Sequence, residues 1–397
     1  MQYIDISSIG EGRQQEKFKL LPRLEAPSRA QRLVASGDCL ISTVRPNRRS
    51  MIWLGTADNN LVASTGFAVL RAKPGVIIPR YLYYSIFNQA FTDYLVTREK
   101  GAAYPAVSTT DIGNAEIDLP SLSEQQEISY ILGALDDRIT LLLETNATLE
   151  AIVQALFKSW FVDFDPVRAK QEGREPEGMD ADTAALFPDS FEESELGLVP
   201  KGWRIDNIYA SAHLIYGAPF SSSKFNSKGI GKPLIRIRDL KDEAPGVFTP
   251  EVHPKGYLVK PGDIVVGMDG EFRAYLWGGD SAWLNQRVCV FMPKTGFPAT
   301  FIHQIIIPIL SAVEASETAT TVIHLGKNDI DRFRILIPNE PVLEAFGKLS
   351  DPVYKKIVEQ KQIARTLTAL RDTLLPRLIS GQLRIPEAET LIEEASA

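Results

Sequence analysis

Residues 123–160 read SEQQEISYILGALDDRITLLLETNATLEAIVQALFKSW, and this stretch decides the fold. Its apolar residues recur at alternating steps of four and three, which is the 3.5-residue repeat of a coiled-coil seam. A helix of this length is about 55–60 Å long. Ser123 can act as its N-cap, with Gln126 at the capping-box position. The predicted seam consists of Ile128, Leu132, Leu135, Ile139, Leu142, Asn146, Leu149, Val153, Leu156 and Trp160.

A second long helix with one apolar stripe is predicted near the C-terminus, and Gly381 is a natural stop for it. A lone helix with one apolar stripe needs a partner, so we expect the two helices to pair. Asn146, the single polar residue of the first seam, would fix their register. The second seam is predicted at Phe346, Leu349, Val353, Ile357, Ile363, Leu367, Leu370 and Leu374.

The chain also repeats itself outside these helices. YIDISSI at residues 3–9 parallels LIRIRDL at 234–240, and four further matches follow in the same order. The offset between the copies falls steadily from 231 to 218 residues, so the copies are collinear. The matched residues are Asp38 with Asp263, Trp53 with Trp277, Gly75 with Gly296, Asp111 with Asp329, and Pro120 with Pro338.

Each copy carries short β-branched runs between Gly and Pro turns, such as CLISTV and DIVVGM, which are typical of a mostly-β domain. PRYLYYSIFNQAFTDYL and TFIHQIIIPILSAV should add one helix each. The predicted fold class is therefore α+β, with two mostly-β domains, each followed by a long helix. The predicted segments are 1–120 (first domain), 121–165 (helix), 166–200 (acidic linker over the surface), 201–338 (second domain), 339–383 (helix) and 384–397 (flexible tail).

The formal net charge is −7, but the acidic residues are concentrated in one segment. Residues 121–200 carry −12, whereas residues 1–100 carry +6. Electrostatic steering of a binding partner depends on the local charge rather than on the net charge of the whole chain. The net charge of −7 therefore does not exclude a nucleic-acid partner. No apolar run reaches the roughly 18–20 residues of a membrane helix, and we expect no membrane partner. Cys39 and Cys289 are expected to be buried free thiols in a reducing cytoplasm.

Patterns that indicate catalysis are weak, and no catalytic or metal-binding residue is predicted. The four histidines have no i,i+4 spacing, and two distant cysteines cannot form a zinc site. No Gly-rich turn of the phosphate-loop or dinucleotide kind is recognisable. Asp163 and Asp165 follow the first helix beside three aromatic residues. We interpret them as a joint, in which the aromatics bury against the other helix and a β domain or against a partner subunit.

Several stretches resemble the specificity (S) subunit of type I restriction–modification enzymes: LPSLSEQQEISYILGALDDRI, ALFKSWFVDFDPV, FPDSFEESELGLVPKGW and LRDTLLPRLISGQLR. The resemblance covers nearly the whole chain. It implies a non-catalytic, cytoplasmic DNA-reading subunit whose two target-recognition domains each read half of a bipartite site. The two helices would pair as an antiparallel coiled coil that spaces the domains and docks methyltransferase subunits.

The same resemblance implies the partners and cofactors. The partners would be double-stranded DNA, two methyltransferase (M) subunits and restriction/translocase (R) subunits. S-adenosylmethionine, ATP and Mg²⁺ are expected only in those partner subunits, with no cofactor in this chain.

The sequence departs from the family at its start. The second copy has about 30 residues before LIRIRDL, including PKGWRI, whereas the first has two residues before YIDISSI. The family normally opens its first domain with a segment like PKGWRI. Three explanations are open: a misassigned start codon, a truncated first domain, or a C-terminal tail that completes the fold.

Contact with DNA needs Arg or Lys for phosphates and Arg, Asn or Gln for base edges. Arg236 and Arg238 alternate along a predicted strand, so they are expected to share a face. The candidates in the first copy are Arg13, Lys17, Arg45, Asn47, Arg48, Arg49 and Tyr104. Those in the second copy are Lys224, Lys228, Arg236, Arg238, Lys241, Arg273, Asn285, Gln286 and Arg287.

Two alternative hypotheses remain beside that of a DNA-recognition subunit. One is a non-catalytic coiled-coil adaptor whose β domains bind peptide or sugar. The other is the recognition subunit of a related restriction system in which cleavage and methylation share one chain.

Overall fold

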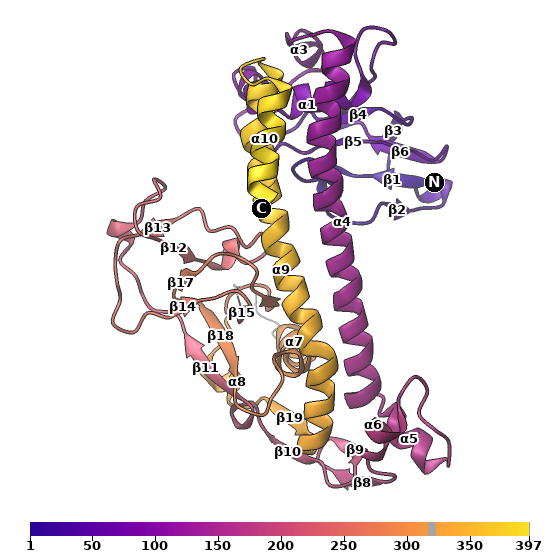
Figure 1. The fold of residues 1–397 in the computed structure, drawn as a ribbon, viewed down its shortest axis with the longest axis vertical. Helices are drawn as coiled ribbons and strands as arrows, with labels where there is room; N and C mark the ends of the chain where they lie inside the picture. The colour runs from indigo at the N-terminus through magenta and orange to yellow at the C-terminus, as the bar shows by residue number, and fades with distance from the viewer. Residues whose placement is uncertain (317–322, 397) are drawn as a thin grey trace. The chain divides into compact units, whose positions relative to one another are not determined.

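The computed structural model describes residues 1–316 and 323–396, and the chain divides into two compact units. The first unit comprises Met1–Thr140 and Arg365–Ala397, and the second comprises Leu141–Ala364. Each unit combines one copy of the repeat with one end of each long helix, α4 and α9 (Figure 1).

The two long helices are α4 (Leu122–Phe161) and α9 (Glu340–Ile379), each of 40 residues. In the first unit, Arg371 of α9 forms an ion pair with Asp136 of α4 at 2.6 Å. In the second unit, Asn146 Nδ2 of α4 donates to the Ile357 carbonyl of α9 at 3.4 Å. Partner numbers on α9 fall as residue numbers on α4 rise, so the helices pair antiparallel, and the predicted fold class is confirmed.

The predicted N-cap of α4 is wrong by two residues. Ser121, not Ser123, forms the capping box: its hydroxyl donates to the Glu124 carboxylate at 2.7 Å and accepts from the Glu124 N–H at 3.3 Å. The neighbouring Gln125 is buried, with its side chain bonded to the backbone of Ile78 and Val76. That anchoring holds the first turn of α4 against the first copy.

All ten predicted seam residues of α4 are buried or half-buried. On α9, Leu374 is buried and Val353, Leu367 and Leu370 are half-buried, whereas Leu349 is 53% exposed. The predictions for Leu349 and for Ile363, which is 42% exposed, therefore need correction. The helix instead buries Ser350, whose hydroxyl is 2.6 Å from the Thr300 hydroxyl of the neighbouring helix α7 (Ala299–Ser316). Because α9 packs against α7 as well as α4 here, its buried face departs from a simple seam.

The first copy contains two sheets. The four-stranded sheet has the order β2-β1-β6-β3, with β1 parallel to β6, and the three-stranded sheet has the order β5-β4-β7. The strands are β1 (Gln2–Ile4), β2 (Lys19–Leu20), β3 (Ala30–Leu33), β4 (Cys39–Ser42), β5 (Met51–Trp53), β6 (Leu61–Ser64) and β7 (Phe67–Leu70). The single helix predicted here is two helices, because Asn88 leaves the helical conformation and caps the second one. The helices are α1 (Pro79–Phe87), α2 (Gln89–Val96) and α3 (Thr109–Gly113).

The second copy repeats these strand orders and adds β11 at the edge of its second sheet. Its sheets have the orders β13-β12-β17-β14 and β11-β18-β15-β16, and β12 is parallel to β17 as β1 is to β6. A further two-stranded sheet pairs β10 with β19, and α8 (Lys327–Ile330) precedes β19. The strands are β10 (Arg204–Asn207), β11 (Ala212–Tyr216), β12 (Lys232–Ile235), β13 (Phe248–Thr249), β14 (Leu258–Val259), β15 (Ile264–Gly267), β16 (Ala274–Leu276), β17 (Ala282–Leu284), β18 (Val288–Pro293) and β19 (Arg334–Ile337).

Polar contacts fasten each copy to the helix pair of its own unit. In the first unit, Arg80 of α1 binds the Asp137 carboxylate at 2.5 Å and the Gly133 carbonyl at 3.1 Å. A Cβ at Gly133 would lie 2.7 Å from the Arg80 guanidinium carbon, so a larger residue there would displace this guanidinium. In the second unit, Lys361 of α9 donates to Glu243 at 2.7 Å and to the Leu276 carbonyl at 2.8 Å.

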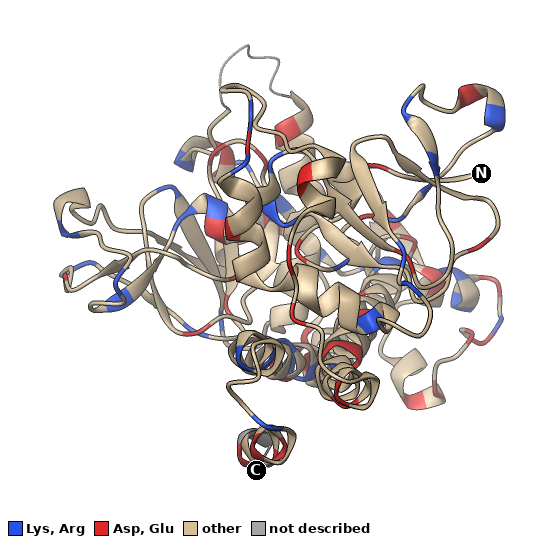
Figure 2. Ribbon diagram, turned by 90° about the horizontal axis from the view of Figure 1, so that it is seen from above, with Lys and Arg blue, Asp and Glu red and all other residues tan. Residues whose placement is uncertain are grey.

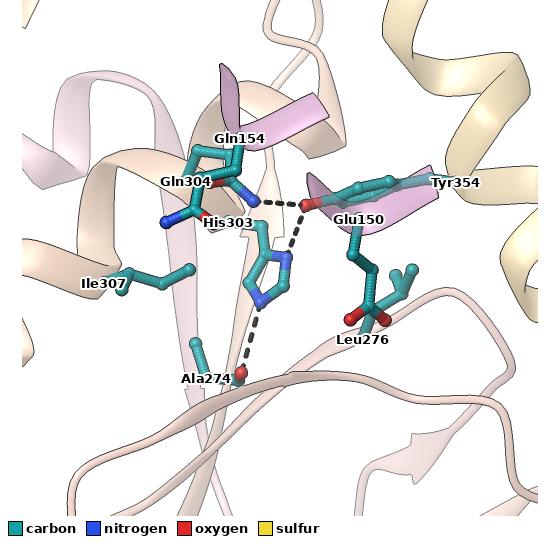
Figure 3. A pocket seen from close by; sticks show the side chains of 8 residues that line it. All are labelled: Glu150, Gln154, Ala274, Leu276, His303, Gln304, Ile307 and Tyr354. Atoms are coloured by element: carbon teal, nitrogen blue, oxygen red, sulfur yellow. Dashed lines mark hydrogen bonds between the residues drawn. The ribbon is translucent and has the colours of Figure 1, made fainter. Parts of the chain in front are cut away.

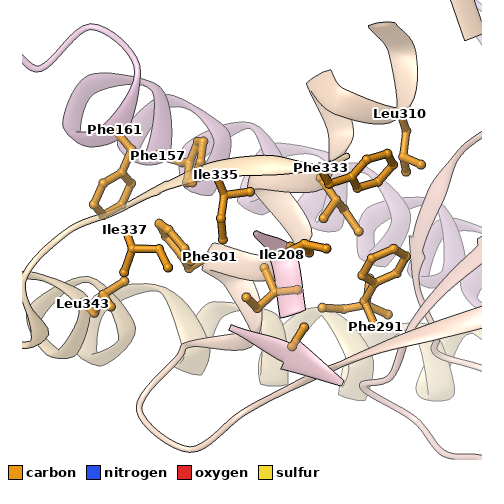
Figure 4. Close-up of a cluster of buried hydrophobic side chains, with 14 of the residues drawn as sticks. Phe157, Phe161, Ile208, Phe291, Phe301, Leu310, Phe333, Ile335, Ile337 and Leu343 are labelled. Atoms are coloured by element: carbon orange, nitrogen blue, oxygen red, sulfur yellow. The ribbon is translucent and has the colours of Figure 1, made fainter. Parts of the chain in front are cut away.

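The aromatic residues at the end of α4 lie in the core of the second unit (Figure 4). Phe161 is 8% exposed, and its ring centroid lies 4.9 Å from that of Phe346 on α9 and 5.2 Å from that of Phe301 on α7. Phe157 and Trp160 are buried in the same cluster. The interpretation of this stretch as a joint is therefore confirmed, since the aromatics pack against the opposing helix and the second copy.

The segment predicted as a surface linker, 166–200, is folded instead. It forms α5 (Asp165–Gln171), α6 (Ala181–Ala185) and a hairpin of β8 (Phe191–Ser194) with β9 (Gly197–Pro200). Val167 and Phe187 are buried in the aromatic core, which explains why an acidic segment is nonetheless held in place.

The C-terminal segment also differs from its prediction as a flexible tail. It forms α10 (Ile385–Ser396), whose apolar spacing lets Ala388, Leu391 and Ile392 join the core of the first unit. Because this segment is helical, it does not supply a strand to the first copy.

Helix α7 alone among helices in the described residues is long and apolar enough to cross a membrane. Its Phe301, Ile302, Ile306 and Leu310 are buried in the core of the second unit. That packing accounts for its apolar composition.

Candidate nucleic-acid interface

The Arg-rich turn of the first copy connects β4 to β5. It is built on the 3-10 helix η3 (Pro46–Arg48), and both flanking residues, Arg45 and Arg49, have left-handed backbones with φ of 49° and 51°. The Arg45 N–H donates to the Pro105 carbonyl at 2.7 Å, which fixes the turn beside the loop that follows α2. Asn47 and Arg48 are exposed at the tip of the turn.

The same turn brings together two candidates that lie 59 residues apart in sequence. The Arg45 guanidinium lies over the ring of Tyr104, 5.0 Å from its centroid, and Tyr104 is 72% exposed. Stacking orders the arginine while leaving its N–H donors available. Arg45, Asn47, Arg48 and Tyr104 therefore form one surface group, which we call the arginine turn; Arg45 is half-buried and the other three residues are exposed.

Arg49 is not part of this surface group. Its guanidinium donates to the Phe87 carbonyl at 2.5 Å and lies 4.4 Å from the Phe87 ring centroid. The residue therefore fastens the arginine turn to the end of α1 rather than facing solvent.

Arg13 and Lys17 are exposed in the loop that precedes β2. Sequence reasoning missed further exposed basic residues of the first copy, namely Lys19 on β2, Arg23, and Arg32 on β3, the opposite edge strand of the same sheet. The signal for them was the excess of basic over acidic residues between positions 13 and 32. Figure 2 shows Lys and Arg on outlying loops as well as on helices.

The prediction that Arg236 and Arg238 share a strand face is wrong. Strand β12 ends at Ile235, and Arg238 lies in the 3-10 helix η6 (Ile237–Asp239). Arg236 binds the buried Asp239 carboxylate through Nε and Nη2, both at 2.9 Å, whereas Arg238 and Lys241 are exposed. The pKa of the Arg236 guanidinium is raised by its hydrogen bond to Asp239, as expected for a structural ion pair.

The other DNA-contact candidates of the second copy also differ in their exposure and in whether they pair with an acidic side chain. Arg273 binds Glu314 at 2.6 Å, and Lys224, in the 3-10 helix η5 (Ser222–Lys224), lies 3.6 Å from Glu251. Arg287 lies 3.8 Å from Asp269. Asn285 is half-buried, whereas Lys228 and Gln286 are exposed. Lys228, Arg238, Lys241 and Gln286 are thus the exposed candidates of this copy for which no side-chain ion pair is recorded within the described residues.

The acids at the end of α4 do not form a paired-carboxylate site. Asp163 forms an ion pair with Lys158 and its carbonyl accepts from Arg168 at 2.8 Å, while Asp165 begins α5. Among the residues that the structure describes, no group of three or more His, Cys, Asp or Glu could hold a metal ion. Cys39 and Cys289 are free and buried, as predicted, and burial raises the pKa of the Cys39 thiol to about 12.

A polar cavity of about 210 Å³ lies in the second unit between α4, α7, α9 and β16 (Figure 3). His303 Nδ1 is 2.6 Å from the Tyr354 hydroxyl, Nε2 is 3.1 Å from the Ala274 carbonyl, and Gln304 donates to the same hydroxyl at 2.8 Å. Burial lowers the pKa of His303 to about 4, so its ring is neutral at pH 7. Because each ring nitrogen already has a partner, we interpret this network as a packing contact rather than an acid–base site.

Comparison with known proteins points to one family. The family described as "Type I restriction modification DNA specificity domain" matches residues 41–151 and 212–380. Each match runs through one copy of the repeat and into the long helix that follows it. Together the two matches cover more than half of the chain.

Individual relatives support the same grouping. The chain is 26% identical to the Type I restriction enzyme HindI specificity subunit of Haemophilus influenzae, over 90% of this chain and 89% of that protein. It is 26% identical to the MjaIX specificity subunit of Methanocaldococcus jannaschii, over 90% and 80% respectively. A type-I restriction-modification S subunit structure from M. genitalium has the same fold, with a TM-score of 0.50, 13% identity, and coverage of 95% of this chain and 88% of that one.

Proposed function

The chain belongs to the family of type I restriction modification DNA specificity domains, and we propose that it reads a split DNA site through its two recognition domains, residues 1–120 and 201–338. One observation carries the proposal. The two copies share one sheet topology, with the same parallel strand pair, and each leads into a 40-residue helix of an antiparallel pair. Two copies of a recognition domain, separated by helices of fixed length, suit a DNA site with two specific halves.

The proposed contacts are the arginine turn of the first domain and the exposed candidates of the second. In the first domain, the arginine turn would present Arg45 and Arg48 to base edges or phosphates, with Tyr104 ordering Arg45. In the second domain, the contacts to DNA would come from Lys228, Arg238, Lys241 and Gln286. Arginine and glutamine form the bidentate contacts that distinguish guanine and adenine, whereas lysine mainly supplies charge to the phosphates.

We assign the chemistry to other subunits. In this proposal the chain itself has no catalytic role and no cofactor, and it acts in the cytoplasm. S-adenosylmethionine would be bound by two methyltransferase subunits, and ATP and Mg²⁺ would be used by partner subunits of the complex. Leu141 and Ile152 of α4, together with Leu349 and Ile363 of α9, are large apolar residues that remain 42–54% exposed on the second-unit part of the helices. Such residues suit docking of a protein partner.

The proposal is tested by DNA binding of the complex with a methyltransferase subunit of the same system. Replacing Arg45 and Arg48 together by alanine should weaken specific binding by roughly tenfold or more, because each bidentate base contact contributes about 1–3 kcal/mol. If either residue contacts a phosphate, the slope of log K against log salt should fall by about one per residue.

The matched control is Arg174→Ala, an exposed arginine paired only with its neighbour Glu172 among recorded ion pairs, and it should leave binding unchanged. Unchanged DNA affinity in the double variant would remove the arginine turn from the interface. That result would favour the alternative hypothesis, in which the chain is a coiled-coil adaptor and the first domain binds peptide or sugar.

A further inference from the structure

Each recognition domain has an inner sheet against the helices and an outer sheet. In the first domain, Cys39 and Ile41 of β4 pack with α1, α2 and α4, whereas Leu40 packs with β1 and β6. The sheet β2-β1-β6-β3 is therefore the outer layer of this domain. Strand β15 divides in the same way, with Val266 toward the helices and Val265 toward the other sheet. The outer layer of the second domain is therefore β13-β12-β17-β14.

The edge strands β2 and β13 are each followed by a loop that contains two prolines, PRLEAP at residues 22–27 and PEVHP at residues 250–254. Gln2 of β1 pairs with Leu20, and the counterpart of Gln2, Pro233 of β12, pairs with Phe248. The offset between Leu20 and Phe248 is 228 residues. At the same offset Pro22 matches Pro250, and the third residue of each loop, Leu24 or Val252, is equivalent to the other.

Both loops present this third residue to solvent. Leu24 is 101% exposed and Val252 is 78% exposed. In the second domain the loop is packed from below, since the His253 ring lies 5.5 Å from the Phe220 ring, centroid to centroid, and Val252 is exposed nonetheless. The exposure is therefore a property of the loop and not of the segment that precedes the sheet in either copy.

Two other leucines of the first outer sheet are exposed, but their counterparts are not. Leu20 corresponds to Phe248, and Leu33 of β3 corresponds to Leu258 of β14, and both of these counterparts are half-buried. Single exposed apolar residues are ordinary on a protein surface. The same kind of residue at one loop position in both domains indicates a role that the domains share.

The loops lie among basic residues. Positions 13–32 of the first domain hold six basic and two acidic residues. Arg23 and Lys255, beside the two apolar residues, are exposed, and no side-chain ion pair is recorded for either among the described residues. The acid of the second loop, Glu251, lies 3.6 Å from Lys224. Such surroundings attract a polyanion, and a lone apolar residue among cations is unlike the contiguous apolar patch of a protein-docking surface.

In the first domain the loop ends near the arginine turn. The Arg29 carbonyl accepts from the Thr65 N–H at 2.8 Å. The adjacent Gly66 carbonyl accepts from the Thr43 N–H at 2.9 Å, and Thr43 is two residues before Arg45. The β6–β7 turn therefore joins the end of the loop to the start of the arginine turn.

The second domain has the equivalent connection. The Tyr257 carbonyl, at the end of the loop, accepts from the Leu284 N–H at 2.9 Å. Leu284 is two residues before Gln286, one of the exposed DNA-contact candidates. In both domains the exposed apolar residue thus lies on a loop that ends beside proposed DNA contacts.

We propose that Leu24 and Val252 contact thymine methyl groups in the major groove of DNA, one in each half of the split site. This inference rests on the proposed function and adds a specificity contact to it. The thymine methyl is the apolar group that base pairs present in the major groove. A wedge between base pairs uses longer or bulkier side chains, whereas Val252 reaches only to its γ-methyl groups. The methyl contact therefore suits both positions.

The probe is the DNA duplex that carries the motif assigned to this system by mapping of modified bases. In two matched duplexes, every thymine of one half is replaced by deoxyuridine on both strands. Deoxyuridine pairs as thymine does and lacks only the methyl group. The complex with the methyltransferase subunit should bind each substituted duplex roughly fourfold more weakly, because one methyl group is lost from an apolar contact. Fluorescence anisotropy measures the affinities.

The variants assign this effect to single residues. Leu24→Ala should abolish the sensitivity to deoxyuridine in one half only, and Val252→Ala should abolish it in the other half only. Because both side chains are exposed, neither variant should alter folding. The matched control is Leu33→Ala, which changes another exposed leucine of the same sheet and should retain the sensitivity in both halves.

The inference is overturned if a half of the motif contains no thymine, if deoxyuridine has no effect, or if the sensitivity persists in either variant. A variant that weakens binding of the thymine and deoxyuridine duplexes equally also overturns it, and indicates a wedge instead. Absence of specific binding by the unaltered complex overturns the proposed function itself. Specific binding without the coupling between residue and methyl group overturns this inference alone.

Discussion

At the scale of single residues, arginines that look equivalent in sequence have different roles. Arg236 and Arg238 are two positions apart, yet the first is bound to Asp239 and the second is exposed. Arg45 and Arg49 are both half-buried, but Arg45 stacks on the exposed Tyr104, whereas Arg49 donates to the Phe87 carbonyl. The partner of Arg236 was readable as an acid three residues later, but the carbonyl that binds Arg49 was not. Composition therefore predicts the candidate set, and tertiary contacts select among its members.

The buried His303 should make the second unit sensitive to acid. Its pKa falls from 6.5 to about 4 because of burial. The unfolded chain therefore takes up this proton near pH 6.5, before the folded chain does. The stability contribution is fully present above pH 6.5 and is lost as the pH falls toward 4, by up to about 3 kcal/mol. Urea unfolding at several pH values measures it.

In His303→Gln this part of the pH dependence should disappear. In His213→Gln, which changes an exposed histidine of β11, it should remain. An unaltered pH dependence in the His303 variant would show that another group is responsible.

At the scale of elements, apolar periodicity predicted both long helices and their pairing, because an apolar stripe on a long helix must be covered. It misplaced Leu349, since the spacing assumes one partner helix whereas α9 there also packs against α7. The folded segment 166–200 was missed for a related reason. Its charge is high, but two apolar residues, Val167 and Phe187, reach an aromatic core assembled from distant parts of the chain.

Asn146 is the polar residue of the α4 seam and should cost stability. It is 5% exposed, donates to the Ile357 carbonyl at 3.4 Å, and its Oδ1 has no recorded partner within the described structure. Asn146→Leu should raise the free energy of unfolding by about 1–2 kcal/mol, because it removes a buried polar atom from an apolar seam. Chemical denaturation checks this, with the exposed Thr148→Leu as the control. A less stable Asn146→Leu would mean that the amide is better satisfied than this geometry indicates.

Phe161 should be essential to the joint at the end of α4. Its ring lies 5–6 Å, centroid to centroid, from those of Phe157, Phe301, Phe346 and Trp203. Phe161→Ala should destabilise the second unit by about 3–5 kcal/mol. Val162→Ala, at the adjacent position and 52% exposed, should cost less than about 0.5 kcal/mol. Similar melting temperatures for the two variants would contradict the packing role.

At the scale of the whole molecule, the repeat was readable because five short matches in collinear order are hard to obtain by chance. Asp38 and Asp263 mark the same strand start in both copies, and the strand orders follow from that equivalence. The two copies begin with segments of different length, and the sequence did not predict what this difference does to the fold of the first copy. Whether the segment corresponding to 203–216 is replaced by another part of the chain depends on tertiary pairing. Within the residues that the structure describes, β7 of the first copy pairs with β4 alone, whereas β18 of the second copy pairs with both β11 and β15.

The central claim is that two recognition domains read two halves of one site. Its most direct test is to co-express this chain with the methyltransferase subunit of its system and to map modified bases across the host genome by single-molecule sequencing. The account predicts a split motif, with two specific halves around a gap of fixed length. Absence of modification, or a motif built from one half alone, would contradict it.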